Sequence, residues 1–347
     1  MSKGNVVLNQ SKHAKNNDEF YTTYETIVEE LTHYEKQLSG KRVFCNCDDP
    51  FESNFSKYFI KNFNKLNLKS LICTSFYASK VVSTEKVSTE KVFLDANGEP
   101  IVSGYGYALE IFQVPHYLTE ESSDDEVIKF IQNECCVKKL DGSGDFRSDE
   151  CISYLKKSDV VVTNPPFSLF RDIVTLIVEH GKQFLLIGNA NALLYKEIFP
   201  LVKNDEAWIG YRFGDMSFKV PNDSEPRKTR FWIDDSGQKW RSLGNAMWFT
   251  NIDIERRHET LKLTCKYDAS KYPKFDNFDA IEVSRVANIP CDYDGIMAVP
   301  VTFLNKYNPA QFEIVGEANH GSDNPFDLFM PMINGKLVYK RILIKRR

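Results

Sequence analysis

Apolar residues recur at two alternating spacings through the first part of the chain. Residues 24–38 place Ile, Val, Leu and Tyr side chains on one helical face, and Gly40 follows directly. The apolar run at 42–47 then predicts a buried strand, and residues 52–66 predict a second amphipathic helix. Residues 69–75 predict the next strand. Strand, helix and strand in this order open a parallel α/β sheet.

The same alternation resumes further along the chain. Residues 124–135 predict a helix with an acidic start, and residues 150–157 predict a shorter one. The run of valines at 159–163 predicts a fully buried strand. A helix at 168–180 and a strand at 184–188 complete the pattern. We therefore assign residues 24–210 to one α/β domain.

An insertion interrupts this domain at about residues 76–103. It contains the five-residue segment 82–86, which is repeated at once as 87–91. A single short duplication is typical of a tolerated loop or hairpin rather than of a repeat protein. Asn97-Gly98 is a favourable hairpin turn within it.

The two ends of the chain have different patterns. Residues 1–23 begin with a polar stretch that predicts a flexible lead, and the lead runs into Phe20-Tyr21-Thr22. Beyond residue 211, short segments rich in Trp, Phe and Arg are separated by turn residues, which predicts a mainly β region over 211–347. This C-terminal region has an excess of basic residues, whereas the chain before it has an excess of acidic residues. A polyanion would therefore bind the C-terminal region more readily.

The overall composition excludes several classes of protein. The chain has 347 residues, 42% of them hydrophobic, and a formal net charge of −4, so it is neither disordered nor a generally basic coat protein. The 8 cysteines form no Cys-x-x-Cys pair, and the 6 histidines are dispersed without metal-ligand spacing. No apolar run has the roughly 20 residues that span a bilayer. We expect a cytoplasmic protein with reduced thiols, no metal and no membrane association.

The most informative motif is Asn164-Pro165-Pro166-Phe167, which follows a buried strand and precedes a helix. Ligands bind at this place in open α/β sheets. An Asn side-chain oxygen and a proline-restrained carbonyl can both accept from an aromatic NH₂ group. Phe167 offers a face on which an extruded base can stack. The motif thus predicts methylation of an exocyclic amine, although Asn-Pro-Pro can also be an ordinary turn.

This arrangement resembles the EcoRI-type adenine-specific DNA methyltransferases. The resemblance rests on the motif and on residues 17–22, 43–50 and 144–147, and it extends from about residue 12 to the C-terminal tail. It implies a Rossmann-like S-adenosylmethionine-dependent methyltransferase sheet with a C-terminal, mainly β target-recognition region. It also implies double-stranded DNA as substrate and a restriction–modification or orphan setting, with a cognate restriction endonuclease acting on the same site as a possible partner.

The donor site is expected at the end of the first strand of the sheet. Many such enzymes have a glycine-rich turn there, but the turn formed by Asn46, Cys47, Asp48 and Asp49 has no glycine. Donor binding is therefore expected to depend on the two carboxylates, which can accept from the donor's amino group or attract its sulfonium. An alternative is that Asp49 only caps the following helix before Pro50.

The resemblance implies further donor contacts. Asp145 would accept from the donor's adenine amino group, and Phe146 would pack on that ring. Phe20, Tyr21 and Thr22 would close over the methionine end. The alternatives are a Gly-Asp surface turn at 144–145 and a hydrophobic lead-in to the first helix.

A basic cluster with interleaved aromatic residues is the predicted DNA-contacting surface. Its basic members are Arg227, Lys228, Arg230, Lys239 and Arg241. Arginine can bind guanine through two hydrogen bonds, and the nearby Trp and Phe rings can stack or wedge. Alternatively, the segment is a solvated hairpin whose tryptophans belong to the core. A second basic group at 340–347 can attract phosphates or keep an edge strand soluble.

Several rival functions remain open on the sequence alone. The same motif can present an RNA adenine, a cytosine amine or a protein glutamine amide. A non-catalytic DNA-binding protein of the same fold is the rival from another class, because the glycine-rich turn is missing. Saturable binding of S-adenosylmethionine separates an enzyme from such a protein.

Overall fold

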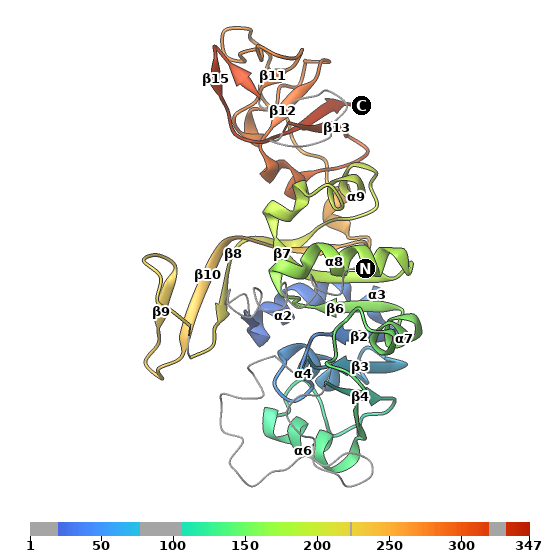
Figure 1. Cartoon of the computed structure of the whole chain (residues 1–347). Coiled ribbons are helices and arrows are strands. Elements are labelled where there is room, and N and C mark those ends of the chain that lie inside the picture. Colours follow the sequence, from blue (N-terminus) through green and yellow to red (C-terminus); the bar gives the residue numbers. More distant parts are fainter. Residues whose placement is uncertain (1–19, 77–105, 223, 319–330) are drawn as a thin grey trace, which may run out of the picture. The chain divides into compact units, whose positions relative to one another are not determined.

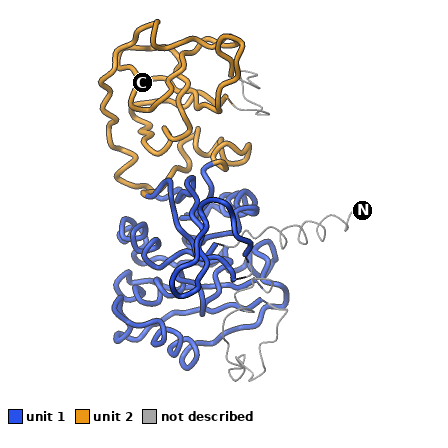
Figure 2. The backbone as a smooth tube through the Cα atoms, turned by 90° about the vertical axis from the view of Figure 1, so that its left-hand side faces the viewer, with its two compact units in different colours: residues 1–190, 212–252 blue, residues 191–211, 253–347 orange. Residues whose placement is uncertain are grey.

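A computed structural model describes residues 20–76, 106–222, 224–318 and 331–347. The predicted polar lead, the duplicated segment and the Asn97-Gly98 turn lie outside the described residues. The chain forms two compact units, which are coloured separately in Figure 2. Unit 1 comprises residues 1–190 and 212–252, and unit 2 comprises residues 191–211 and 253–347. The predicted division into residues 1–23, 24–210 and 211–347 stays a prediction.

A large mixed sheet organises unit 1. Among the described residues it has ten strands in the order β1-β8-β10-β7-β6-β2-β3-β4-β5, with β9 paired to β10. The bounds are β1 Tyr21–Thr22, β2 Arg42–Asn46, β3 Ser70–Thr74, β4 Tyr107–Ile111, β5 Val137–Lys139, β6 Val160–Thr163, β7 Gln183–Asn189, β8 Trp208–Lys219, β9 Phe231–Ile233 and β10 Lys239–Thr250. The molecule is thus a mixed α/β protein, as the alternating pattern predicted.

Four central strands of this sheet are parallel. β2 pairs with β3 on one side and with β6 on the other, and β6 pairs with β7. The chain runs from β2 outward to β3 and later returns to β6 on the opposite side of β2. Strand order therefore reverses between β2 and β6, and ligands bind at the carboxyl ends of strands at such a point. Val43, Phe44 and Val161 are fully buried there, as expected of a parallel core strand.

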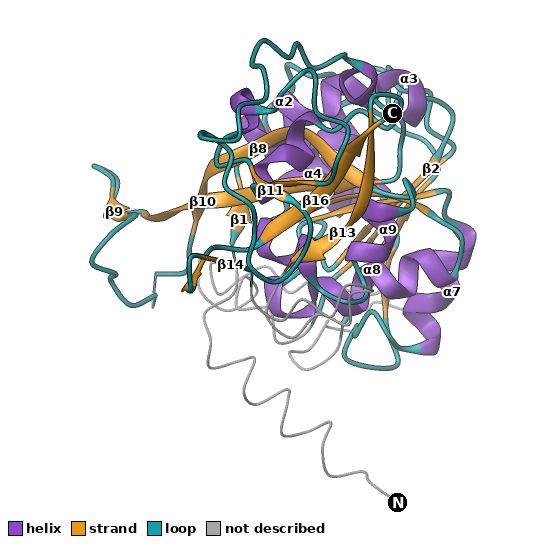
Figure 3. Ribbon diagram, turned by 90° about the horizontal axis from the view of Figure 1, so that it is seen from above, coloured by secondary structure: helices purple, strands orange, loops and turns teal. Residues whose placement is uncertain are grey.

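Helices cover both faces of these strands. Figure 3 shows α2, α3 and α4 on one side and α7 and α8 on the other. The bounds are α2 Tyr24–Leu31, α3 Glu35–Leu38, α4 Asn54–Lys61, α6 Asp124–Glu134, α7 Asp149–Lys157 and α8 Phe170–Glu179. These helices confirm the positions of the apolar patterns, with two corrections. The predicted helix at 24–38 is divided, because a 3-10 turn at Thr32–Tyr34 separates α2 from α3. α4 is shorter than the predicted helix at 52–66, because residues 62–67 form turns.

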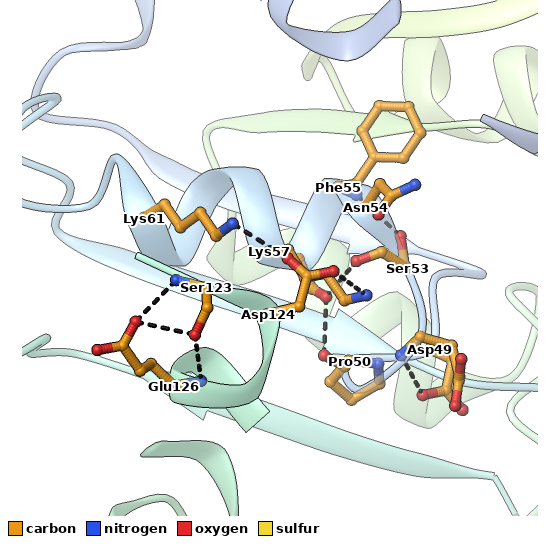
Figure 4. A network of polar contacts seen from close by, with 12 residues as sticks. Asp49, Pro50, Ser53, Asn54, Phe55, Lys57, Lys61, Ser123, Asp124 and Glu126 are labelled. Atoms are coloured by element: carbon orange, nitrogen blue, oxygen red, sulfur yellow. Dashed lines mark hydrogen bonds and ion pairs between the residues drawn. The ribbon is translucent and has the colours of Figure 1, made fainter. Parts of the chain in front are cut away.

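Polar caps begin several helices at serine residues. Ser53 accepts from the Phe55 amide at the start of α4. Ser123 and Glu126 form a capping box at the start of α6, drawn in Figure 4. Such caps satisfy backbone amides that have no partner within the helix. In the same figure Asp124 pairs with Lys57 and Lys61, which ties α6 to α4.

Strands β8, β9 and β10 form an extension of the sheet that we call the arm (residues 212–250). Figure 1 shows the arm in yellow, reaching beyond the helices of unit 1. β10 pairs with β7 through residues 246–250, which are buried, whereas its first half pairs with the short edge strand β9. The arm is therefore anchored in the core at one end and exposed at the other.

Unit 2 contains a separate four-stranded sheet in the order β11-β12-β16-β13. The bounds are β11 Ile281–Glu282, β12 Met297–Val299, β13 Phe312–Ala318 and β16 Arg341–Arg346, with α9 Phe199–Lys203 and a small pair of β14 Met332–Ile333 and β15 Lys336–Leu337. Arg341 pairs with Glu282 at 2.5 Å, and both side chains are largely buried. Strand β16, which contains part of the basic group at 340–347, thus contributes buried residues to the core of unit 2. No helix in the described ranges is long and apolar enough to cross a membrane.

Candidate active site

The Asn-Pro-Pro-Phe motif lies directly after β6, at the point where strand order reverses. Thr163, the last residue of β6, is fully buried, and Phe167 begins the short helical turn that leads into α8. Pro166 has extended backbone angles and breaks the path between strand and helix. The motif is therefore a rigid connection at the carboxyl edge of the sheet.

The side chain of Asn164 is held in one orientation by the N-terminal segment. Its amide nitrogen donates to the Phe20 carbonyl at 2.5 Å and to the Thr22 hydroxyl at 3.1 Å. Because a carbonyl can only accept, the nitrogen must face Phe20. The Asn164 Oδ1 atom is buried and has no hydrogen-bond partner among the residues that the structure describes. A buried acceptor without a partner is costly, so this atom is available for a ligand donor.

Three aromatic rings pack beside this amide. Phe20 stacks on Phe167 with ring centroids 5.2 Å apart and planes at 26°. Phe218 of β8 meets both rings edge-on, at 5.5 Å and 6.4 Å. The Arg241 guanidinium lies 5.0 Å from the centre of the Phe20 ring. Phe20 is thus in contact with a flat aromatic ring and a cation, the surroundings that suit a stacked base.

The turn after β2 brings two carboxylates to the same edge of the sheet. Cys47 has a positive φ of 69°, and both Asp48 and Asp49 are buried. Asp49 accepts from the amides of Phe51 and Glu52 and from the Tyr107 hydroxyl. Burial raises the pKa of Asp49, and these donors act against that rise. Ser53 caps α4, so Asp49 closes the preceding turn rather than the helix.

Asp48 connects this turn to the end of β6. Its carboxylate accepts from the Ser53 hydroxyl at 2.7 Å and lies 2.5 Å from the Thr163 hydroxyl. Burial raises the pKa of Asp48 to about 7, although the bonds from Thr163 and Ser53 lower it. In the part of the chain that the structure describes, no cationic side chain pairs with Asp48 or Asp49. Two buried carboxylates without cations suit a positively charged ligand such as a sulfonium donor.

Glycines allow a further loop to approach this edge. A Cβ on Gly144 would lie 2.0 Å from the Ser75 carbonyl oxygen, and one on Gly106 would lie 2.7 Å from the Gly144 backbone. Gly144 also has φ of +75°. Only glycine permits this close packing, which places Asp145 next to the end of β3.

Asp145 and Phe146, which were predicted to contact the methyl donor, both contact Arg147. Arg147 donates to both oxygens of Asp145, at 2.9 Å and 2.7 Å. Burial opposes ionisation of Asp145, but the bonds and charge of Arg147 hold its pKa below the usual value. Phe146 is buried, and the Arg147 guanidinium lies 5.1 Å from its ring centre. Asp145 and Phe146 are thus both in contact with Arg147.

The predicted DNA-contacting residues lie in the arm and divide into two groups. Arg230 pairs with Asp215 at 2.8 Å, and the Lys239 ammonium donates to backbone carbonyls at 2.5 Å and 2.9 Å. Arg241 contacts the Phe20 ring, as described above. Arg227 and Lys228 are exposed. The first three residues thus help to shape the arm, whereas Arg227 and Lys228 point their charges to solvent.

Trp232 and Trp240 of the arm are not core residues, contrary to the simpler interpretation of their sequence. Trp232 and Trp240 stack across β9 and β10 at 6.1 Å with planes at 4°. Trp232 is 41% exposed. Lys219 of β8 lies 5.7 Å from the Trp240 ring centre. These side chains share the face of the arm opposite to Phe218 and Arg241, because successive strand residues point to opposite sides.

Sequence reasoning missed three residues at the site. Tyr107 contacts Asp49 from β4, Thr163 contacts Asp48 from β6, and Phe218 packs against the Phe20 and Phe167 rings from β8. Thr163 precedes the motif directly, and this position was a usable signal. Tyr107 and Phe218 gave none, because strand pairing rather than sequence proximity brings them to the site.

Comparison with known proteins agrees with this geometry. The family described as "Adenine-specific methyltransferase EcoRI" matches residues 7–347, and the chain belongs to this family. It is accordingly a DNA adenine methyltransferase that uses S-adenosylmethionine as methyl donor. No solved structure matches the chain.

Three curated relatives match over nearly their whole length. The Type II methyltransferase M.EcoRI of Escherichia coli is 42% identical, covering 99% of this chain and 97% of its own. M.MgeORF184P of Mycoplasma genitalium and M.MpnI of Mycoplasma pneumoniae, also described as Type II methyltransferases, are 35% and 36% identical and cover 98% of both chains. The match therefore includes the Asn-Pro-Pro-Phe motif, the arm and unit 2.

Proposed function

We propose that the enzyme methylates N6 of an adenine that has left the stack of a specific DNA site, and that Asn164 and Pro165 hold its amine. The buried Oδ1 of Asn164, which has no partner, carries this proposal. It can accept one amine hydrogen while the Pro165 carbonyl accepts the other. The nitrogen lone pair would then be free to face the methyl donor.

Orientation supplies most of the catalysis in this scheme. The donor contributes a methyl group already activated on a positively charged sulfur. The chain's residues therefore need only align the amine and exclude water, and no strong base is required. Pro165 and Pro166 keep the accepting carbonyl fixed, and the Phe20 and Thr22 contacts keep the Asn164 amide from rotating.

The donor would bind at the carboxyl end of β2. Asp48 and Asp49 would face its charged end, and Asn46 and Cys47 would line the same turn beside it. Support comes from the burial of both carboxylates without a cation partner in the described ranges. Asp145 and Phe146 would receive the adenine ring beside Arg147, and Tyr21 would close the site with its neighbours.

The target base would take the face of Phe167 that Phe20 now covers. Phe20 stacks there at 5.2 Å, a distance that leaves no room for a base between the rings. Entry of the base thus requires Phe20 to move aside. DNA binding could release Phe20 through Arg241, because a DNA phosphate near Arg241 would compete with the Phe20 ring for the guanidinium.

The DNA would lie along the arm. Arg227 and Lys228 are exposed and would supply phosphate contacts, and Arg230, Lys239 and Arg241 would shape the strand that reaches the grooves. In this proposal the large sheet is a Rossmann-like methyltransferase sheet, and residues 211–347 form the target-recognition region. The relatives are described as Type II methyltransferases, which favours a restriction–modification setting with a cognate endonuclease.

Transfer of labelled methyl to duplex DNA, followed by nucleoside analysis, tests the assignment of the amine-holding residue. Wild-type protein should yield N6-methyladenine, and Asn164→Ala should yield almost none. Asn64→Ala is a matched control, because Asn64 also donates to a backbone carbonyl but at Val114. Equal product from Asn164→Ala and the control would contradict the role of Asn164.

The same assay separates the rival functions. Single-stranded RNA and a glutamine peptide, offered at equal concentration, should receive no label. Label on RNA alone would refute the DNA assignment. Absence of saturable donor binding would favour a protein that has kept the fold but lost the reaction.

A further inference from the structure

Thr163 links the proposed donor side of the site to the proposed target side. Its hydroxyl oxygen contacts two groups, the Asn46 backbone carbonyl and the Asp48 carboxylate. The distance to Asp48 Oδ2 is 2.5 Å. Thr163 is fully buried and directly precedes Asn164, so any change at its hydroxyl occurs beside the amine-holding residue.

Hydrogen-bond counting at this hydroxyl favours an additional proton. A threonine hydroxyl has one hydrogen, and a carbonyl and an ionised carboxylate are both acceptors only. The two contacts therefore compete for one hydrogen. Both are satisfied when Asp48 carries a proton on Oδ2, donates it to Thr163, and Thr163 donates to the Asn46 carbonyl. Asp48 Oδ1 then still accepts from Ser53.

The surroundings of Asp48 favour the protonated form. Burial raises its pKa to about 7, and the negative charge of Asp49 adds to the rise. The neighbouring thiols of Cys45 and Cys47 stay neutral, because burial raises their pKa values as well. Lys57 acts on Asp49, where it lowers the pKa, and forms its ion pair with Asp124. No cation in the described part of the chain balances an ionised Asp48.

We propose that Asp48 and Thr163 hold one proton between them in the donor-free enzyme, and that binding of the cationic donor releases it to solvent. The O–H bond of Asp48 breaks, the electron pair stays on the carboxylate, and the proton passes to the buffer. The sulfonium charge replaces the proton as the partner of the carboxylate. This inference rests on the donor site proposed above.

Thr163 is a positioning residue in this scheme. When Asp48 is ionised, the threonine hydrogen turns either to the carboxylate or to the Asn46 carbonyl, so the contacts at the end of β6 change when the donor arrives. Donor binding would thereby change the hydrogen bonds of the residue next to Asn164. By linkage, donor affinity must rise with pH as long as the free enzyme still holds the proton.

Calorimetric titration of the full-length protein with S-adenosylmethionine measures the released proton. At pH 6.5, in buffers of different ionisation enthalpy, the binding heats should differ by an amount equal to roughly half to one proton. S-adenosylhomocysteine has the same amino and carboxyl groups without the sulfonium charge, and it should release distinctly less. The donor Kd should tighten about tenfold between pH 6 and pH 8.

Variants assign the proton to this pair. Asp48→Asn should abolish the buffer dependence and flatten the Kd against pH, and Thr163→Val should reduce both effects. Thr163→Ser, which keeps the hydroxyl, should restore them. Asp125→Asn removes an exposed carboxylate of α6 and should behave as wild type.

Distinct results would overturn this inference and the proposed donor site. Donor binding with equal heats in all buffers, or a proton release that survives in Asp48→Asn, would refute the shared proton and leave the donor site intact. Equal release with S-adenosylhomocysteine would refute the sulfonium as its cause. Failure of the wild-type protein to bind donor would instead refute the donor site. If Asp48→Asn does not fold, wild type and the two Thr163 variants still decide the question.

Discussion

The carboxyl ends of β2 and β6 are neighbours in the sheet, yet they have opposite hydrogen-bonding characters. After β2, Asp49 accepts from two backbone amides and the Tyr107 hydroxyl, and Asp48 contacts the Ser53 and Thr163 hydroxyls. After β6, the Asn164 nitrogen has two acceptors, and its oxygen has no partner among the described residues. One end therefore holds buried carboxyl groups in a supported turn, and the other keeps a single neutral acceptor open.

This difference matches the two substrates of the reaction. A sulfonium donor carries charge and is attracted by carboxylates that are already fixed in place. An adenine amine is neutral and needs direction more than attraction, which one fixed amide oxygen and a proline-held carbonyl can provide. The contrast can be tested by changing one end and measuring the function of the other.

The largest effect is expected from Asn164→Ala. Loss of a fixed acceptor for the amine should lower kcat by about 100- to 1000-fold, the range seen when one preorganised hydrogen-bonding group is removed from a site. The donor Kd, measured by titration, should change by less than about threefold because β2 is untouched. An equal loss in donor affinity would show that the two ends do not act separately.

Asp48→Asn should change how stability depends on pH. The pKa of Asp48 is raised from 3.8 to about 7, so the folded state keeps a proton that the unfolded chain loses. Its contribution is fully present below about pH 4 and is lost as the pH rises toward 7. Between pH 5 and pH 8 the free energy of unfolding of wild type should fall relative to the variant by on the order of 3 kcal/mol. Urea denaturation of both proteins at the two pH values measures this difference, and parallel curves would contradict it.

Tyr107→Phe removes a hydrogen bond to Asp49 at the end of β2 and leaves both carboxylates in place. The buried hydroxyl of Tyr107 donates to Asp49, and its loss should cost about 1–3 kcal/mol in free energy of unfolding. The donor Kd should weaken by about tenfold while kcat at saturating donor stays near wild type. Tyr117→Phe is the control, because that exposed hydroxyl also donates to a carboxylate, Glu134. A matching loss in the control would show that the buried contact with Asp49 has no special role.

The smallest effects are expected in the arm, away from both strand ends. Arg227→Ala and Lys228→Ala should each weaken DNA binding several-fold and make the salt dependence shallower by about one unit of slope. Donor binding should not change. Lys69→Ala, at the amino end of β3, removes an exposed charge on the opposite edge of the sheet and should leave the slope as it is. An unchanged slope in both arm variants would place the DNA elsewhere.

Local sequence patterns were sufficient for most of the central sheet. The apolar runs ending at Asn46 and Thr163 predicted strands that the structure confirms, and the helical periodicity at 24–38 predicted as one helix what the structure divides into α2 and α3. The motif residues could be located because a strand before them and a helix after them are both local features. The length of α4 was overestimated, because its apolar pattern continues through residues that form turns. The hairpin-like strands of the arm were predicted only as a β-rich texture.

By itself, the sequence determined the alternating α/β pattern, the Asn-Pro-Pro-Phe motif at the end of a strand, and the acidic turn after the first core strand. Only the tertiary structure decided which partners these groups have. In the folded chain Tyr107 contacts Asp49, Thr163 contacts Asp48, and the Phe20 carbonyl accepts from the Asn164 amide. The physical reason is that periodicity and turn chemistry act over a few residues, whereas strand order brings together residues separated by 58, 115 and 144 positions.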